Sequence, residues 1–177
     1  GQENKKIVYA GLYWSATYLY NSGKGIKNEK FKAIDASREA YNQIKIKFPN
    51  QEMYTNVSGE LIFDGIKTEN FKESAPYVCY ADITNLVLNT ATPFGTYTVA
   101  NIKSTVGKLS GGVAAGWTLF FVYEDATMTQ KFITSYDGFA GITDRSIDIP
   151  FSGFQTLAEG KVTAKIACAA LEGDVKL

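Results

Sequence analysis

The sequence predicts an all-β domain, a β-sandwich or jelly-roll-like fold with at most one or two short helices. Two observations carry this prediction: many short stretches have strand-like composition, and turn residues separate them. The chain has 177 residues, of which 45% are hydrophobic, which is enough for one domain with a real core. We therefore expect residues 1–177 to form a single β-domain.

The N-terminal strands are predicted from composition and from alternation. Residues 5–18 are rich in β-branched and aromatic residues, and both faces of this stretch are apolar, so it should lie inside a sheet. Residues 41–50 alternate apolar side chains with lysines up to Pro49, which indicates a half-exposed strand. Further strands are expected at 52–58 and 60–64.

The connecting segments are less uniform. Residues 21–30 indicate a polar loop, and residues 31–41 fit a short helix, a loop or a strand. Asp82 can cap one helical turn over 83–87, because its carboxylate can accept the free amide hydrogens there. The glycine-rich residues 106–116 lack the lysine and serine or threonine that end a phosphate-binding loop, so we expect a flexible connection.

The second half of the chain is expected to supply the remaining strands. Residues 94–104 alternate, and residues 116–124 and 130–137 have the pattern of two strands joined by a short loop. The alternating stretch 146–151 and the apolar stretch 161–171 are the last strands that we expect.

Three of these strands should be central in their sheets. Both faces are apolar over residues 6–14, 95–102 and 116–124, and a strand with two apolar faces needs a layer on each side. Trp117 should then be buried.

Composition excludes several classes of function. The chain has no histidine, which excludes Ser-His-Asp and Cys-His catalysis and histidine zinc sites, and its two cysteines exclude a four-thiolate site. Its 18 basic and 18 acidic residues make it a poor non-specific binder of nucleic acid. The longest apolar run, Trp117 to Tyr123, is too short to span a bilayer.

Three carboxylates, Glu124, Asp125 and Asp137, have two interpretations. They lie where strands leave the core, and the end of a hairpin accounts for all of them. The functional alternative is a calcium site, because calcium binds carboxylate oxygens. This alternative would gain support if Asp144 or Asp174 lay at the same end of the domain. No regular calcium-loop spacing is present, and nothing sets two carboxylates across a cleft for glycoside hydrolysis. We expect no enzyme activity.

Cys79 and Cys168 are far apart in the sequence, and two interpretations stay open. A disulfide would close a loop of roughly 90 residues and contribute ~4–5 kcal/mol in the chain-entropy model. Alternatively, both are buried free thiols, since cysteine packs as a small apolar group. Export from the cell would favour the disulfide.

Several motifs occur together and in a fixed order. They are "IVYAGLYWSA" (7–16), "YADITNLV" (80–87), "GTYTVANI" (95–102), "AAGWTLFFVYED" (114–125), "YDGF" (136–139) and "LEGD" (171–174). Taken together they resemble a domain of large secreted and cell-surface bacterial proteins, nearest to the gliding-motility adhesins of Bacteroidetes that the type IX secretion system exports. The chain departs from this pattern at Thr118 and at Phe120-Phe121, where serine and smaller aliphatic residues are expected.

The resemblance implies a binding or structural module and carries over no catalytic residue. It implies a secreted or surface location, and as partners other surface proteins, the secretion machinery or surface glycans. It also implies that the natural chain continues beyond Asp174, so that a partner strand or more chain covers the last apolar stretch. Alternatives are a spacer or cap of a long surface fibre and, third, a carbohydrate-active hydrolase.

Aromatic residues near the N-terminus are the candidates for ligand contact. Tyr13, Trp14, Tyr18 and Tyr20 form the densest aromatic group, and such rings can stack on sugars. Trp14 and Tyr13 are expected to pack within the fold. Tyr18 and Tyr20 adjoin the polar loop and are therefore the predicted ligand-facing residues.

Overall fold

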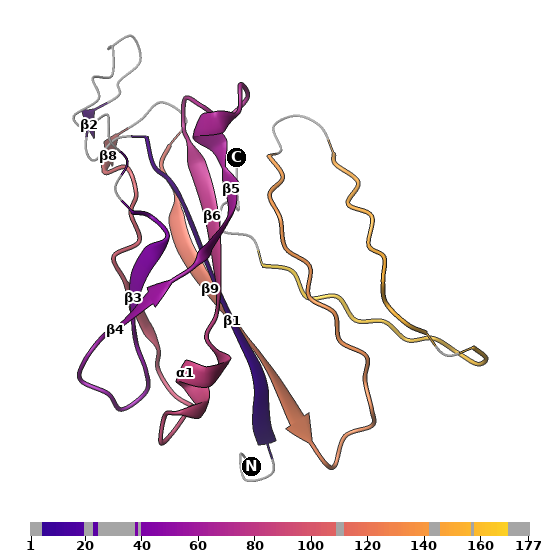
Figure 1. Ribbon diagram of the computed structural model, residues 1–177. Coiled ribbons are helices and arrows are strands. Elements are labelled where there is room, and N and C mark those ends of the chain that lie inside the picture. The colour runs from indigo at the N-terminus through magenta and orange to yellow at the C-terminus, as the bar shows by residue number, and fades with distance from the viewer. Residues whose placement is uncertain are drawn as a thin grey trace.

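A computed structural model describes residues 5–19, 23–24, 38, 40–108, 112–141, 146–156 and 158–169. Most of its regular structure is strand, which confirms the predicted all-β class (Figure 1). The strands are β1 (Lys5–Thr17), β2 (Gly23–Lys24), β3 (Gln43–Lys47), β4 (Thr55–Ser58), β5 (Glu60–Asp64), β6 (Pro76–Asp82), β7 (Thr98–Ala100), β8 (Gly107–Lys108) and β9 (Ala115–Asp125). The described helices are a 3-10 turn, η1 (Gly65–Lys67), and α1 (Thr84–Leu88).

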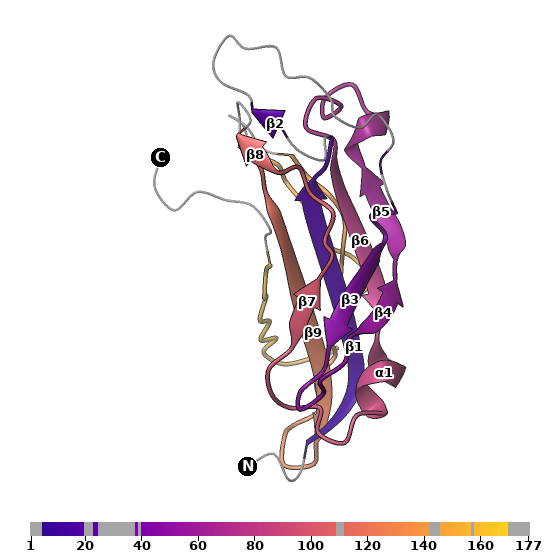
Figure 2. The same ribbon diagram turned by 90° about the vertical axis from the view of Figure 1, so that its left-hand side faces the viewer.

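Two antiparallel sheets form the body of the domain. One is four-stranded in the order β5-β6-β1-β9, and the other is three-stranded in the order β4-β3-β7. Figure 2 shows the three-stranded sheet in front of the long strands, and a small parallel pair, β2 and β8, lies at one end. The core fills the space between the two sheets and includes Leu12, Trp14, Ile44, Ile46, Tyr77, Cys79 and Val87.

β1 is the central strand of the larger sheet, as its two apolar faces predict. It pairs with β6 on one side and β9 on the other, and Trp14 lies opposite both Cys79 and Trp117. The Trp14 side chain is fully buried, and its indole N–H donates to the Tyr41 carbonyl at 2.9 Å. A Cβ on Gly59 would lie 2.3 Å from the Trp14 ring, so only glycine leaves room for this ring.

Other local predictions are also confirmed. In and beside β3, Ile44, Ile46 and Phe48 are buried at 2%, 0% and 3% exposure, whereas Lys45 lies on the exposed face. A helical turn follows Asp82 as expected, and the Asp82 carboxylate accepts the Thr84 amide at 2.9 Å, but α1 begins at Thr84, one residue later than predicted, and its N-cap is Ile83 rather than Asp82. Most of 21–30 and 31–41 lies outside the described residues.

The predicted central positions of 95–102 and 116–124 are wrong. β7 is an edge strand of the three-stranded sheet, and β9 is an edge strand of the larger one. Trp117 is consequently 37% exposed rather than buried. The apolar pattern identifies the faces that need cover, but it does not say which segment supplies that cover.

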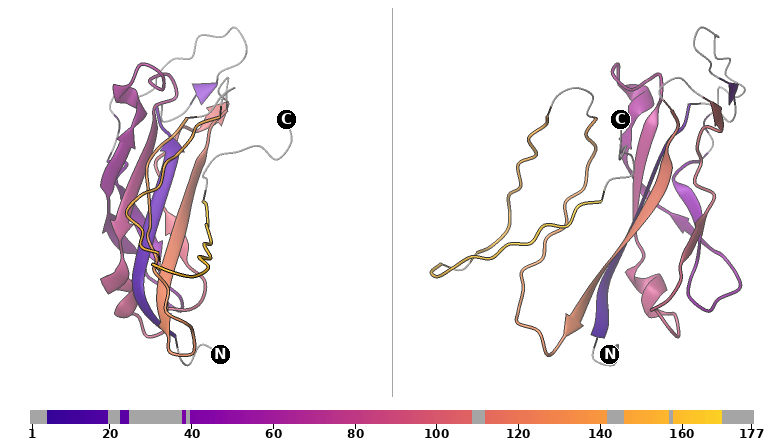
Figure 3. Two further views of the ribbon diagram at one scale, coloured as in Figure 1. Left: turned by 90° about the vertical axis from the view of Figure 1, so that its right-hand side faces the viewer. Right: turned by 180° about the vertical axis from the view of Figure 1, so that it is seen from behind.

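The strands expected at 130–137, 146–151 and 161–171 are not found in the described part of these ranges. The chain there is extended but makes no strand ladder, and it lies beyond the four-stranded sheet, opposite the smaller sheet (Figures 1 and 3). A turn follows β9, with the Met128 amide donating to the Asp125 carbonyl at 3.0 Å. Its central residues, Ala126 and Thr127, lack the positive φ of the type I′ and II′ turns that favour two-residue hairpins.

Candidate interaction surface

The three predicted calcium ligands do not converge. Glu124 is paired with Lys6 at 3.8 Å, and Asp125 accepts the Thr127 amide and hydroxyl at 2.9 and 2.6 Å. Asp137 instead accepts the Tyr13 hydroxyl at 2.9 Å. Hydrogen bonds from Thr127 lower the pKa of Asp125, as expected for a turn carboxylate. No group of three possible metal-ligand side chains occurs in the part of the chain that the structure describes.

Tyr18, predicted to face a ligand, is buried at 2% exposure. Its ring makes edge contacts with Tyr41 and Tyr77, with a centroid distance of 6.4 Å to each. It follows β1 on the face that points into the core, and sequence proximity to a polar loop does not reveal that direction. Tyr20 lies outside the described residues.

The two cysteines are free and lie in different environments. Cys79 is buried in β6 opposite Trp14 of β1, whereas Cys168 is exposed, so the disulfide interpretation is wrong and the buried-thiol interpretation holds for Cys79 alone. Burial, followed by the nearby Asp64 carboxylate, raises the pKa of the Cys79 thiol to about 12.

Thiol titration should therefore separate the two residues. At about pH 8 a water-soluble thiol reagent should modify Cys168 rapidly and Cys79 only after unfolding, because a buried neutral thiol is unreactive. The Cys168→Ser variant is the matched control and should show no rapid phase. A count of thiols in denaturant that rises when reductant is added would contradict the free-thiol structure.

A buried polar cluster, which the sequence did not reveal, lies at the end of β5. The Arg38 guanidinium pairs with Asp64, with side-chain exposures of 9% and 6%, and also donates to the Ala75 carbonyl at 3.2 Å. The Tyr41 hydroxyl donates to the same carboxylate at 3.0 Å. Burial alone would raise the pKa of Asp64, but hydrogen bonds from Arg38 and Tyr41 and the Arg38 charge lower it overall.

This cluster is structural in its geometry. The Arg38 guanidinium carbon lies 4.4 Å from the Tyr41 ring centroid and 5.7 Å from that of Tyr18, so aromatic rings enclose it. The ion pair fixes the segment before β3 to the end of β5. Because both side chains are buried, the pair offers little surface to a ligand.

The edge of β9 is the longest of the four edges of the two antiparallel sheets that the structure describes, because β9 has 11 residues whereas the edge strands β5, β4 and β7 have 5, 4 and 3. β9 pairs with β1 along its whole length, from Ala115 opposite Ala16 to Asp125 opposite Lys5. Among the described residues, no strand pairs with its other side. This edge therefore presents a long row of backbone amide and carbonyl groups to an added strand.

Side chains on β9 extend the apolar surface along this edge. Leu119 and Phe121 pack against the core, and Trp117 continues the same row. On the opposite face, Phe120 is 37% exposed beside Tyr13, with ring centroids 5.8 Å apart. An added strand would find apolar contacts on both faces of the sheet.

A second surface, here called the outer aromatic face, covers the four-stranded sheet on the side away from the core. It comprises Tyr9, Tyr13, Phe63, Tyr80 and Phe120. The Tyr9 and Tyr80 hydroxyls lie 3.0 Å apart, and the Tyr13 and Tyr80 rings are 4.9 Å apart. Burial, and then the Asp137 hydrogen bond, raises the pKa of Tyr13, so this hydroxyl stays a proton donor at neutral pH.

The returning chain touches this face at one place. Phe139 stacks on Phe63 at 3.9 Å with nearly parallel rings, and it meets Phe71 edge-on at 5.2 Å. Together with the hydrogen bond from Tyr13 to Asp137, these contacts hold residues 137–141 on the outer aromatic face.

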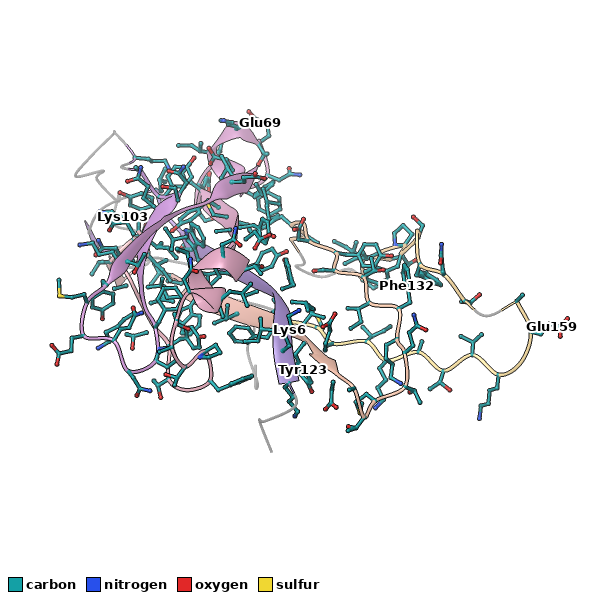
Figure 4. The ribbon with its side chains drawn as sticks, turned by 60° about the horizontal axis from the view of Figure 1, so that its bottom comes forward. Lys6, Glu69, Lys103, Tyr123, Phe132 and Glu159 are labelled. Atoms are coloured by element: carbon teal, nitrogen blue, oxygen red, sulfur yellow. The ribbon has the colours of Figure 1, made fainter. Side chains whose placement is uncertain are left out.

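The remainder of this segment is strongly exposed. From 126 to 169, every described residue except Phe139 is exposed, including large apolar side chains (Figure 4). They are Met128, Phe132, Ile133, Tyr136, Ile147, Ile149, Phe151, Phe154, Val162 and Ile166. An apolar set of this extent usually marks an interaction surface.

Comparison of the chain with protein-family models, with curated proteins and with solved structures finds no match. Within the described residues, no helix is long and apolar enough to cross a membrane. The geometry of β9 and of the following segment is therefore the main evidence on function.

Proposed function

We propose that this chain is an adhesin-like binding module of a secreted or cell-surface protein, and that it attaches to other proteins by accepting a β-strand at the edge of β9. The observation that carries the proposal is the long β9 edge, unpaired among the described residues and bordered by Trp117 and Phe120. The sequence motifs that resemble bacterial surface adhesins support the location.

Strand addition is supported over sugar binding by the positions of the aromatic residues. Tyr18 and Trp14, both in the aromatic group considered for sugar stacking, are buried. Tyr13 already donates its hydroxyl to Asp137. In contrast, an open edge supplies main-chain hydrogen bonds for affinity and alternating side chains for specificity.

Short peptides with alternating valine and threonine provide a direct test. The intact chain should bind them saturably, measured by fluorescence polarisation, because each peptide can extend the larger sheet. Trp117→Lys should abolish binding, since an inward-pointing charge at a sheet edge opposes strand addition. Met53→Lys, at a side chain that is 79% exposed and away from β9, is the matched control and should bind normally.

Two results would contradict this proposal. One is the absence of peptide binding by a correctly folded chain. The other is equal binding by the Trp117→Lys and Met53→Lys variants, which would place the contact elsewhere. A glycan array run on the same proteins would reveal the sugar-binding alternative, whereas a pure spacer would bind neither probe.

A further inference from the structure

Residues 161–168 have the strict alternation of a strand with one apolar face. Val162, Ala164, Ile166 and Cys168 share one face, and Lys161, Thr163 and Lys165 share the other. Ile166 is 83% exposed, the highest value among the exposed large apolar side chains. The segment is extended and makes no strand ladder within the described residues. It therefore has the pattern of a strand and lacks a partner for its apolar face.

The β9 edge has two rows of side chains that differ in character. The core-side row is wholly apolar or aromatic, with Trp117, Leu119, Phe121 and Tyr123. The outer row ends in a carboxylate and contains Thr118, Phe120, Val122 and Glu124. A matching strand therefore needs an apolar row and a mixed row, and a positive charge on that mixed row can join Lys6 beside Glu124, whose side chain is 67% exposed.

We propose that residues 161–169 of a second copy of this chain add to the edge of β9 as an antiparallel strand, with Lys161 opposite Glu124. This inference rests on the proposed function, because it names the partner of the same edge. On the core side the register pairs Val162 with Tyr123, Ala164 with Phe121, Ile166 with Leu119 and Cys168 with Trp117. On the outer side it pairs Thr163 with Val122, Lys165 with Phe120 and Ala167 with Thr118.

Shifting the donor strand by one or two residues makes its pairing with β9 less favourable. A shift of one residue turns both lysines toward the core-side row, because side chains alternate between faces. A shift of two residues in one direction sets Glu159 opposite Glu124, and like charges directly opposite each other are destabilising. In the other direction Lys161 passes beyond Asp125, the last residue of β9. The chosen register alone sets Lys161 opposite Glu124 and Lys165 beside the Phe120 ring.

The donor segment pairs with neither sheet of its own molecule within the described residues. Residues 137–141 are held on the outer aromatic face by Tyr13, Phe63 and Phe71. Beyond them the chain leads away from both sheets, and Figure 4 shows Glu159 at the end farthest from them. From there residues 161–169 lead back toward the four-stranded sheet (Figures 1 and 3), yet within the described residues they make no ladder with β9, so the edge stays open to the same segment of another molecule. Each copy would offer one donor segment and one acceptor edge.

Cross-linking through the exposed Cys168 tests this register. Directly opposite residues have Cα atoms about 4.5–5.5 Å apart, within the range that a disulfide bridges. The Trp117→Cys variant should therefore form an inter-copy disulfide with Cys168. Two versions of the variant with different tags, mixed and mildly oxidised, should give a mixed dimer on a non-reducing gel. Thr118→Cys, on the outer row, is the control and should give little dimer.

Charge reversal provides a second test that leaves the core untouched. The variants Lys161→Glu and Glu124→Lys should each weaken self-association in sedimentation equilibrium, and the double variant should restore it. Unchanged association, an intrachain disulfide in the Trp117→Cys monomer, or no cross-link would each overturn the second-copy proposal. If valine-threonine peptides still bind the β9 edge in that case, the proposed function stands and the inference about its partner alone fails.

Discussion

Replacing Asp64 with asparagine should lower the free energy of unfolding by about 3–5 kcal/mol, because the substitution leaves a buried Arg38 charge without its counter-ion. Both side chains are more than nine-tenths buried, so solvent cannot compensate for the lost carboxylate. Chemical denaturation followed by circular dichroism measures this loss. The Arg38→Met variant should also be destabilised, but less, because the exposed Lys67 amine still lies 3.9 Å from the Asp64 carboxylate.

The surface pair Lys72–Glu69 is the matched control. Its N···O distance is 2.7 Å, but the side chains are 52% and 88% exposed, so Glu69→Gln should change stability little. Tyr41→Phe removes one neutral donor to Asp64 and should cost about 1 kcal/mol. Equal effects of Asp64→Asn and Glu69→Gln would show that the buried cluster is not formed.

The same carboxylate gives a defined pH dependence. The pKa of Asp64 is lower in the folded protein than its ordinary value of 3.8. Its contribution to stability is therefore complete above that value and is lost as the pH falls through the folded-state pKa. The native protein should lose stability in this acid range, and the Asp64→Asn variant should lose less over the same interval.

Replacing Trp14 with alanine should cost about 3–5 kcal/mol of folding free energy, because a large, fully buried ring leaves a cavity that the core cannot close. The indole also donates to the Tyr41 carbonyl, and this hydrogen bond would be lost as well. Thermal and denaturant unfolding measure the change. If the alanine variant does not fold, Trp14→Phe should fold with an intermediate loss.

Trp117→Ala is the control, since Trp117 lies directly opposite Trp14 on the same face. Its side chain is 37% exposed at the sheet edge, so its removal should cost clearly less in dilute, monomeric protein. If the two alanine variants lost equal folding free energy, the edge of β9 would have to be covered in the monomer.

The sequence predicts a structure correctly where that structure depends on the pattern of neighbouring residues. The two apolar faces of β1 predicted its central position, and the alternation from Ile44 to Phe48 predicted the buried face of β3. The position of Asp82 before an apolar turn likewise predicts that its carboxylate accepts the first amide of that turn. In each case neighbouring residues contain the required information.

Prediction from the sequence fails where the partner of a segment lies far along the chain. The pattern of β9 showed that two faces need cover, yet it could not show that one edge stays unpaired. Likewise, residues 161–169 have the composition of a strand, but a ladder requires a second strand in register. The apolar pattern encodes the need for a partner without encoding which partner it is.

The candidate site divides in the same way. Glu124 and Asp125 end β9 beside a turn, as expected, whereas Asp137 lies in extended chain because 130–137 forms no hairpin with β9. The contacts of these three residues with Lys6, Thr127 and Tyr13 depend on the fold. The Arg38–Asp64 pair joins residues from separate elements, and Arg38 lies in a range without a clear pattern. The sequence marks Arg38 only as a charged residue in a stretch whose secondary structure is ambiguous.

Amide hydrogen exchange along β9 tests the central claim most directly. The measurement compares the intact chain alone with the chain saturated by its tightest-binding strand peptide. Strand addition predicts new protection at alternate amides of β9, whose N–H groups point away from β1, with no change in the edge strand β7. Unchanged exchange in β9 at saturation, or protection confined to another surface, would contradict the claim that this edge is the binding site.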